Sequence, residues 1–323
     1  MTWMESVWGR FWPLLETLGW WILLGMLLGW LLQFLPAGNR QTGKKGWHIP
    51  VAALLGALLP MCNFAAIPLA AALLSGGAGT GVSLAFLAGA TLLNPAGLLL
   101  GWGYLGAPLT LAYALSAGAL SLLAGFAGGH CENEIPRPEG FPDFASKLLL
   151  WLMLGIIAEA VLLAAAPPSL WQRLVLNPPG ASLWETAAAG LLRHVCIPDD
   201  ISLAASLTAS GLRPGWAVLL LLMGVSSNLP ELFVLCGVAG KKTAAVYLLT
   251  MVSASILAAL LTQWVLGPGF VPQFNLANAE SFTALANLLS IRTWMPAKIP
   301  CACTLLLLSG WALWRRGKQW FGF

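Results

Sequence analysis

Two stretches of the chain, residues 60–95 and 194–229, carry the pattern that predicts its fold. The first is PMCNFAAIPLAAALLSGGAGTGVSLAFLAGATLLNP, and the second is HVCIPDDISLAASLTASGLRPGWAVLLLLMGVSSNL. A shift of 134 residues aligns them without a gap, and it pairs cysteine, glycine and asparagine residues that apolar sequence rarely matches by chance. The constant offset therefore predicts two copies of one structural unit.

The match continues on both sides of the glycine-rich centre. The paired residues are Cys62 and Cys196, Ile67 and Ile201, Gly77 and Gly211, Gly81 and Gly215, Asn94 and Asn228, Gly103 and Gly237, Gly106 and Gly240, and Tyr113 and Tyr247. We expect a first transmembrane repeat in residues 1–130, a connecting loop in 131–147 and a second repeat in 148–266. A loop and a C-terminal transmembrane helix are expected in 267–323.

The composition places the chain in a membrane. Of its 323 residues, 59% are hydrophobic and 9% are charged, and the mean hydropathy is +0.81. Soluble chains are about 45–50% apolar and about 25% charged. Nine stretches approach the length needed to cross the bilayer: 12–35, 51–75, 82–100, 105–127, 148–166, 183–210, 216–238, 243–266 and 296–314. We therefore expect an all-α polytopic membrane protein with about 7–9 transmembrane segments.

The placement of basic residues predicts an orientation. They gather in the loop of Arg40, Lys44 and Lys45, at 241–242, and in the tail at 315–318. The positive-inside rule places these segments in the cytoplasm, so we expect a bacterial cytoplasmic (inner) membrane with the N-terminus outside and the C-terminus inside. The expected partners are the lipid bilayer and a small solute or ion, with a homo-oligomer left open. No basic-aromatic pattern indicates nucleic-acid binding.

Each copy is expected to contain two broken helices. The breaks lie at Pro60-Met61-Cys62-Asn63 with Pro68 beyond it, at Asn94-Pro95, at 193–200 with Pro198, and at Asn228-Leu229-Pro230-Glu231. Proline removes a helical hydrogen bond, and opened backbone at membrane depth must line a cavity or be buried in protein. Four breaks in equivalent places predict one central site. The alternative is that the prolines only kink packed helices.

Segments 51–75 and 183–210 allow two topologies. Each could span once as a kinked helix, which gives four spans per copy and parallel repeats. Each could instead form a re-entrant hairpin with arms of about 12 residues, which leaves three spans per copy and inverts the second copy. The polar residues at 193–200 favour the hairpin, because they suit its tip better than a spanning helix.

Ionisable residues within membrane segments predict function, because burying them is costly. Asp199 and Asp200 repel each other, which favours uptake of a proton by one of them. With His194 they are the predicted proton-coupling residues, unless this cluster only meets the lipid headgroups. Glu231 follows a break and is predicted to reach the same cavity.

Substrate contacts are predicted at the breaks, from Cys62, Asn63, Asn94, Cys196, Asn228 and Glu231. The asparagines either bind solute or re-satisfy freed backbone groups. Thiolates at the two cysteines would suit soft metals or trivalent metalloids, although the metal ligands stay unknown. No cofactor is expected. The sequence contains no Walker loop, HExxH or dinucleotide motif, so the chain is not expected to be an enzyme.

The motifs Pro60-Met61-Cys62-Asn63, Ile67-Pro68-Leu69 and Asn94-Pro95 resemble a family of predicted permeases. That family includes organoarsenical efflux permeases and proteins predicted to export copper or zinc. Ser210-Gly211-Leu212 and Asn228-Leu229-Pro230 in the second copy resemble it too, so the likeness spans roughly residues 60–247. It implies a secondary permease that exports a toxic metal or metalloid. The family's second thiol is missing at Cys62-Asn63-Phe64, so the likeness carries over the architecture and not the metal substrate.

The predicted function is therefore a secondary, proton-coupled permease that moves a small solute across the membrane by alternating access. A metal or metalloid compound is one candidate solute, which would make the chain an efflux protein for metal or metalloid resistance. Two alternatives stay open. One is a membrane thiol oxidoreductase that relays reducing equivalents through Cys62 and Cys196, and the other is a channel.

Overall fold

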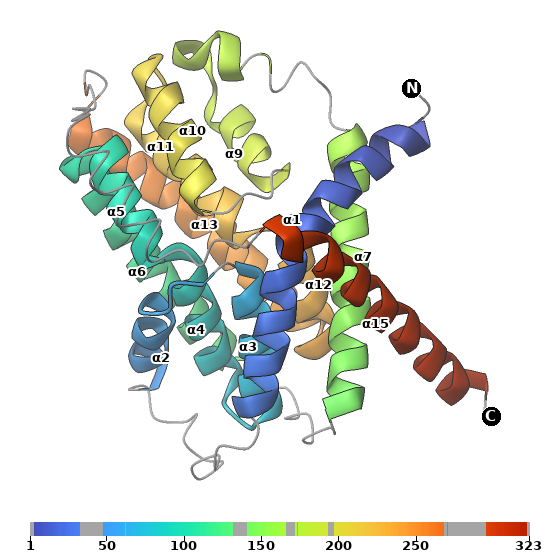
Figure 1. Cartoon of the computed structure of the whole chain (residues 1–323). Coiled ribbons are helices and arrows are strands. Elements are labelled where there is room, and N and C mark those ends of the chain that lie inside the picture. The colour runs from blue at the N-terminus through green and yellow to red at the C-terminus, as the bar shows by residue number, and fades with distance from the viewer. Residues whose placement is uncertain are drawn as a thin grey trace.

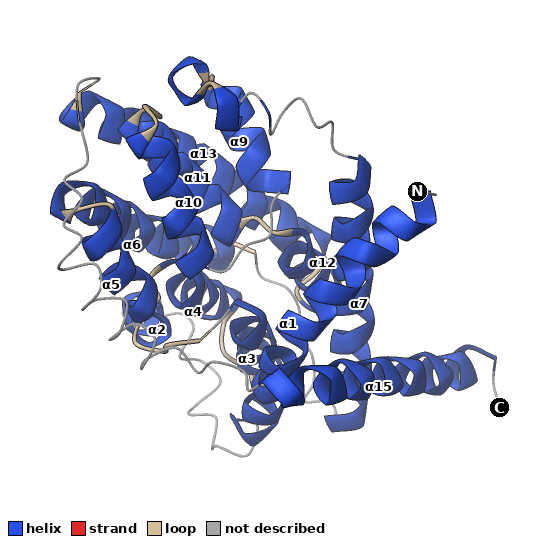
Figure 2. Ribbon diagram, turned by 45° about the horizontal axis from the view of Figure 1, so that its top comes forward, coloured by secondary structure: helices blue, strands red, loops and turns tan. Residues whose placement is uncertain are grey.

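The computed structural model of the chain describes residues 3–32, 48–61, 63–131, 141–165, 172, 174–192, 197–267, 270 and 295–321. Within these residues the regular structure is helical, without a strand (Figure 2). The expected all-α polytopic membrane architecture is confirmed.

The helices follow one another in two series. The first series is α1 (Trp3–Leu32), α2 (His48–Ala57), α3 (Asn63–Ser75), α4 (Thr80–Leu92), α5 (Pro95–Tyr104) and α6 (Ala107–Gly129). The second is α7 (Phe141–Ala165), the short η2 (Pro178–Gly180), α9 (Leu183–Leu192), α10 (Ile197–Ala209), α11 (Pro214–Ser226), α12 (Leu229–Val238) and α13 (Lys241–Leu266), and α15 (Met295–Phe321) follows it. Helix α7 begins at Phe141, inside the predicted connecting loop.

The two series have matching bounds. Adding 134 to the first and last residues of α3, α4 and α5 gives those of α10, α11 and α12. Glycines with positive φ follow the same offset: Gly77 (94°) and Gly211 (100°) in the turns after α3 and α10, and Gly106 (77°) and Gly240 (90°) before α6 and α13. Glycine adopts this backbone conformation without the steric cost of a Cβ. These agreements support the interpretation of the chain as two repeats.

Close helix packing also recurs at the offset. Gly81 of α4 lies against the backbone of Gly125 in α6, and Gly215 of α11 lies against the backbone of Ala259 in α13. A Cβ at either glycine would overlap a carbonyl oxygen of the neighbouring helix. Small residues allow transmembrane helices to approach this closely. The two helix pairs therefore pack in the same way.

The halves interlock through equivalent contacts. Helix α3 packs against α12, α10 packs against α5, and α6 packs against α13. Figure 1 shows α2 and α3 in the lower half of the molecule and α9 and α10 in the upper half. This placement favours the inverted arrangement over the parallel one.

Fewer helices can span a membrane than the sequence predicted. In the described part of the chain, four helical segments are long and apolar enough to span: Thr80–Tyr104 (α4 and α5 together), Ala107–Gly129, Pro142–Ala165 and Lys241–Leu266. The number rises to six if two bent pairs each count as one span, namely the two parts of α1 and the pair α11 and α12. Two of the nine expected stretches, 51–75 and 183–210, each form a pair of helices of 10 and 13 residues. At 1.5 Å per residue these arms are about 15–20 Å long, too short to span alone and suited to a hairpin.

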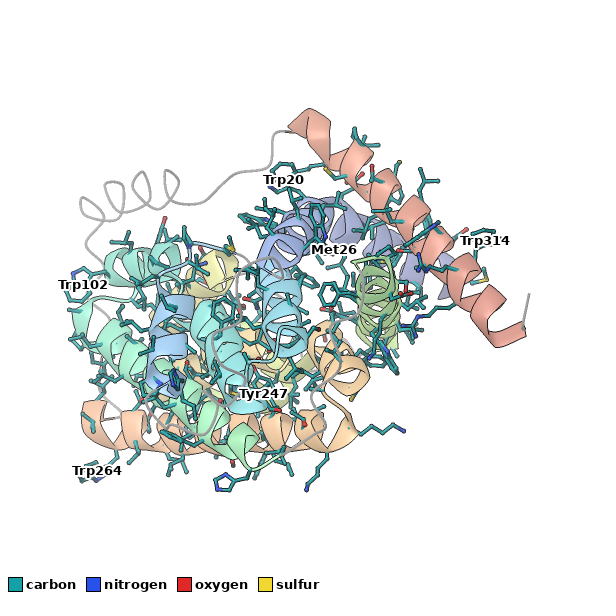
Figure 3. All side chains as sticks on the ribbon, turned by 90° about the horizontal axis from the view of Figure 1, so that it is seen from below. Trp20, Met26, Trp102, Tyr247, Trp264 and Trp314 are labelled. Carbon is teal, nitrogen blue, oxygen red and sulfur yellow. The ribbon has the colours of Figure 1, made fainter. Side chains whose placement is uncertain are left out.

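Exposed tryptophans mark the outside of the helix bundle, and a buried tyrosine marks its interior. Figure 3 shows Trp102, Trp264 and Trp314 at the periphery and Tyr247 among the helices. Trp264 is 82% exposed, whereas Tyr247 is fully buried. The polar groups around Tyr247 are therefore inside the protein and away from lipid.

Candidate functional site at the helix breaks

The break between α11 and α12 is organised by Asn228. Its Oδ1 accepts a hydrogen bond from the Glu231 backbone N–H at 3.1 Å, which caps α12. Its Nδ2 donates to the Val225 carbonyl at 3.1 Å and to Glu231 Oε2 at 3.3 Å. Pro230 stands in the first turn of α12, where a helix needs no donor from it, and α11 and α12 meet at 44°.

Glu231 lies at the centre of this break and is fully buried. The Tyr247 hydroxyl donates to its Oε1 at 2.6 Å, so both carboxyl oxygens accept a hydrogen bond. No basic residue in the described ranges forms an ion pair with it; Arg315, for example, pairs with Asp143 at 3.0 Å. A buried carboxyl without a counter-charge responds strongly to a proton or a polar ligand beside it.

Asn63 brings the first half of the chain to this point. It opens α3, directly after the first break, and its Nδ2 donates to the Val225 carbonyl at 3.0 Å. The same carbonyl accepts from Asn228. The structure therefore brings together three of the predicted site residues, Asn63, Asn228 and Glu231, in one buried network.

The equivalent break of the first half is also capped by an asparagine but lacks the acid. Asn94 Oδ1 accepts from the Ala96 backbone N–H at 2.9 Å, and its Nδ2 donates to the Met61 carbonyl at 2.7 Å. Tyr113, the counterpart of Tyr247, donates instead to the Leu92 carbonyl at 2.6 Å. The position that corresponds to Glu231 is Gly97. The carboxyl group is thus a feature of the second half.

Asp200 occupies a separate buried position and is 1% exposed. Its Oδ2 lies against Gly224 of α11, where an added Cβ would come within 2.9 Å of it.

The other predicted residues have varied positions. Pro60 is in the non-helical segment before α3, Pro95 begins α5, and Pro198 is in the first turn of α10. Pro68 was predicted to mark a break but lies inside α3, which continues to Ser75. Pro68 is the sixth residue of α3, beyond the first turn, and the helix continues past the hydrogen bond that proline cannot donate. Cys62, His194 and Cys196 lie outside the described residues, as does the side chain of Asp199.

Two groups of this site were not predicted from the sequence. Tyr247 was recognised only as a repeat match with Tyr113, and the Val225 carbonyl gives no sequence signal. Among the described residues no three His, Cys, Asp or Glu side chains come close enough to hold a metal ion. The cysteines described as free are Cys131, Cys236, Cys301 and Cys303.

Comparison with known families supports a permease. Residues 21–129 match a family described as predicted permease, and this match runs from within α1 to the last residue of α6. No curated protein and no solved structure is significantly similar to the chain. The predicted resemblance is confirmed over that range. Together with the apolar helices it indicates a membrane transporter rather than an enzyme.

Proposed function

We propose that the chain is a secondary permease whose solute site is the junction of the broken helices and whose coupling ion is the proton. The observation that carries the proposal is the Asn63–Val225–Asn228–Glu231 network. It joins a break of the first half to a break of the second half around a buried carboxyl group. Transporters built from repeats bind solutes at such interfaces between discontinuous helices.

The network suits alternating access because few bonds hold the two halves together there. Asn63 reaches Val225 through one hydrogen bond of 3.0 Å, which a small shift of α3 against α11 breaks. Within the second half, Asn228, Glu231 and Tyr247 are linked by their own hydrogen bonds. We expect the second half to keep the acid in place while the first half moves, which exposes Glu231 to one side or the other.

The solute is expected to be small and to carry groups that pair with amides and a carboxyl. Trivalent metalloid compounds with hydroxyl groups meet this description, and the resemblance to organoarsenical efflux permeases makes them the first candidates. Efflux of such a compound would confer metalloid resistance. Cys62 would supply the thiol contact in that case, since it directly precedes Asn63.

The orientation is proposed from the basic segments and the arrangement of the chain ends. Figure 1 has the N-terminus near the top of the molecule and the C-terminus near the bottom. The tail that carries Arg315 and Arg316 would face the cytoplasm by the positive-inside rule. We therefore propose a bacterial inner-membrane location with the N-terminus outside.

The test combines binding with transport in purified, reconstituted protein. Arsenicals, soft metal ions, inorganic anions and small metabolites are screened for an increase in thermal stability, because a ligand of the folded state raises it. The solute found is then supplied to proteoliposomes and its uptake is measured. We expect uptake by the wild type and loss of both signals in Asn228→Ala, but not in Glu5→Gln, whose acid is exposed at the start of α1. Binding without uptake in the wild type would contradict a permease.

A further inference from the structure

A narrow cavity of about 20 Å³ runs between α3, α4 and α12. Helix α12 lines it from Glu231 to Ala239, α3 lines it from Ile67 to Leu74, and α4 lines it from Thr80 to Leu87. The nine residues from Glu231 to Ala239 span about 12 Å along the helix axis. The residues that line the cavity thus extend along most of α12, with the buried acid near one end, and the free space between them is about the size of one water molecule.

A second polar group lines this cavity and lacks a partner. The Ser83 hydroxyl is buried, and it has no hydrogen-bond partner among the described residues. Leaving a buried hydroxyl unpaired costs about 1–3 kcal/mol. A cavity of about 10–15 Å³ is enough for one water molecule, so the space present is large enough for one water, and Thr80, Ser83 and Glu231 are the polar residues of its lining.

The end of the cavity that is far from Glu231 lies near one face of the protein. There α3 ends at Ser75 and α4 begins at Thr80, and α12 is followed by the turn to α13. Helix α13 begins with Lys241 and Lys242, which are exposed. The cavity therefore leads from Glu231 toward the face that carries these two lysines.

The ionisable surroundings of Glu231 are few. Helices α3 and α4 carry no ionisable residue, and α12 carries only Cys236 besides Glu231. Helix α13 contributes Tyr247, which bonds to Glu231, and the lysine pair at its start. Helix α7 contributes Asp143 and Lys147 in its first two turns. Gly155 of the same helix lies against Pro230, next to Glu231, and the buried Glu159 is one turn beyond Gly155.

We propose that this cavity is the closed form of a water path through which Glu231 exchanges its proton with the side of the membrane that faces Lys241 and Lys242. The inference rests on the proposed coupling role of Glu231 and adds its route of access. The proton passes between the carboxyl group and water, with the Ser83 hydroxyl as an intermediate hydrogen-bonding group, and no other bond is made or broken. Ala70, Ala71 and Ala239 along the path leave room for it to widen when the halves move.

The test is thiol labelling from each side of the membrane. In full-length protein whose six native cysteines are replaced by serine, Ser83→Cys and Val238→Cys are made singly. Right-side-out and inside-out vesicles are treated with a charged, membrane-impermeant thiosulfonate. Lys242→Cys marks the proposed side, and Leu249→Cys, which is 69% exposed on α13, marks the lipid face. We expect both path cysteines to react only in the vesicles in which Lys242→Cys reacts, and Leu249→Cys to stay unlabelled.

Two outcomes would overturn the proposal: labelling from the opposite side, or no labelling of either path cysteine while Lys242→Cys reacts. The conservative Ser83→Cys and the helix-end Val238→Cys report independently, so poor insertion of one leaves the other decisive. The result does not depend on solute transport. Solute uptake is measured in the wild type: its absence together with one-sided labelling would refute the proposed function and keep the path. Uptake by the wild type without one-sided labelling of the path cysteines would refute the path alone.

Discussion

Replacing Tyr247 by Phe should destabilise the protein more than replacing Tyr113 by Phe. Both tyrosines are buried, lie 134 residues apart, and donate one hydrogen bond of 2.6 Å. They differ in the acceptor, which is a carboxyl oxygen of Glu231 for Tyr247 and a backbone carbonyl for Tyr113. A hydrogen bond to a charged group contributes about 1.5–3 kcal/mol and a neutral one about 0.5–1.5 kcal/mol. Burial without a counter-charge favours the protonated acid, so at a pH high enough to ionise Glu231 we expect a difference of about 1 kcal/mol or more.

The measurement is equilibrium unfolding in mixed micelles at increasing dodecyl sulfate, followed by circular dichroism. The same Tyr247→Phe change is repeated in a Glu231→Gln background. Because the two residues are in direct contact, their effects should not add, and the cycle isolates the energy of this one bond. Repeating the series at acid pH should shrink the difference between the two tyrosines, since a protonated acid makes a weaker hydrogen bond.

Equal losses for Tyr247→Phe and Tyr113→Phe at every pH would refute this reasoning. Additive effects of Tyr247→Phe and Glu231→Gln would do the same, because they would mean that the hydroxyl and the acid do not interact. In either case the hydrogen bond between Tyr247 and Glu231, which has no counterpart in the first half, would not stabilise the buried network.

Six further substitutions test the helix packing, the helix caps at the breaks and the coupling role of Asp200. Gly81→Ala and Gly215→Ala should each lower the melting temperature, because overpacking costs about 1–3 kcal/mol. Gly118→Ala is the control: nothing lies within 4 Å of the added Cβ, so this change should raise stability by up to about 1 kcal/mol. Similar melting temperatures for all three variants would contradict the close packing at Gly81 and Gly215. Asn94→Ala and Asn228→Ala each remove a helix cap, which should lower the free energy of unfolding by about 0.5–2 kcal/mol. The loss should be larger for Asn228→Ala, because this change also removes the hydrogen bond to Glu231. Chemical unfolding measures the free energy of each variant. Asp200→Asn should insert normally and lose the pH dependence of transport in vesicles, and an unchanged pH profile would remove this residue from coupling.

Much of the helix order follows from the sequence offset alone. The repeat predicted equivalent breaks at Asn94 and Asn228, and both residues cap the helix that follows. It also paired Gly77 with Gly211, which share a positive φ. These features are local, since a cap or a turn depends on a few neighbouring residues.

The number of spans and the composition of the site depend on tertiary structure. Hydropathy treats 51–75 as one continuous apolar stretch, whereas the chain turns between α2 and α3. The match of Tyr113 with Tyr247 did not predict their different acceptors, because the Tyr247 bond requires α13 to lie beside the first turn of α12. Ser83 looks like any small polar residue of a helix until the cavity beside it is seen.

The most direct test of the proposed function is proton movement in proteoliposomes that contain an entrapped pH-sensitive dye. The solute identified by thermal stabilisation is added outside, and wild type is compared with Glu231→Gln and with Glu5→Gln. We expect solute-dependent proton flux in the wild type and in Glu5→Gln, and loss of that flux in Glu231→Gln. Proton flux in Glu231→Gln equal to that of the wild type would contradict a coupling site at the helix breaks.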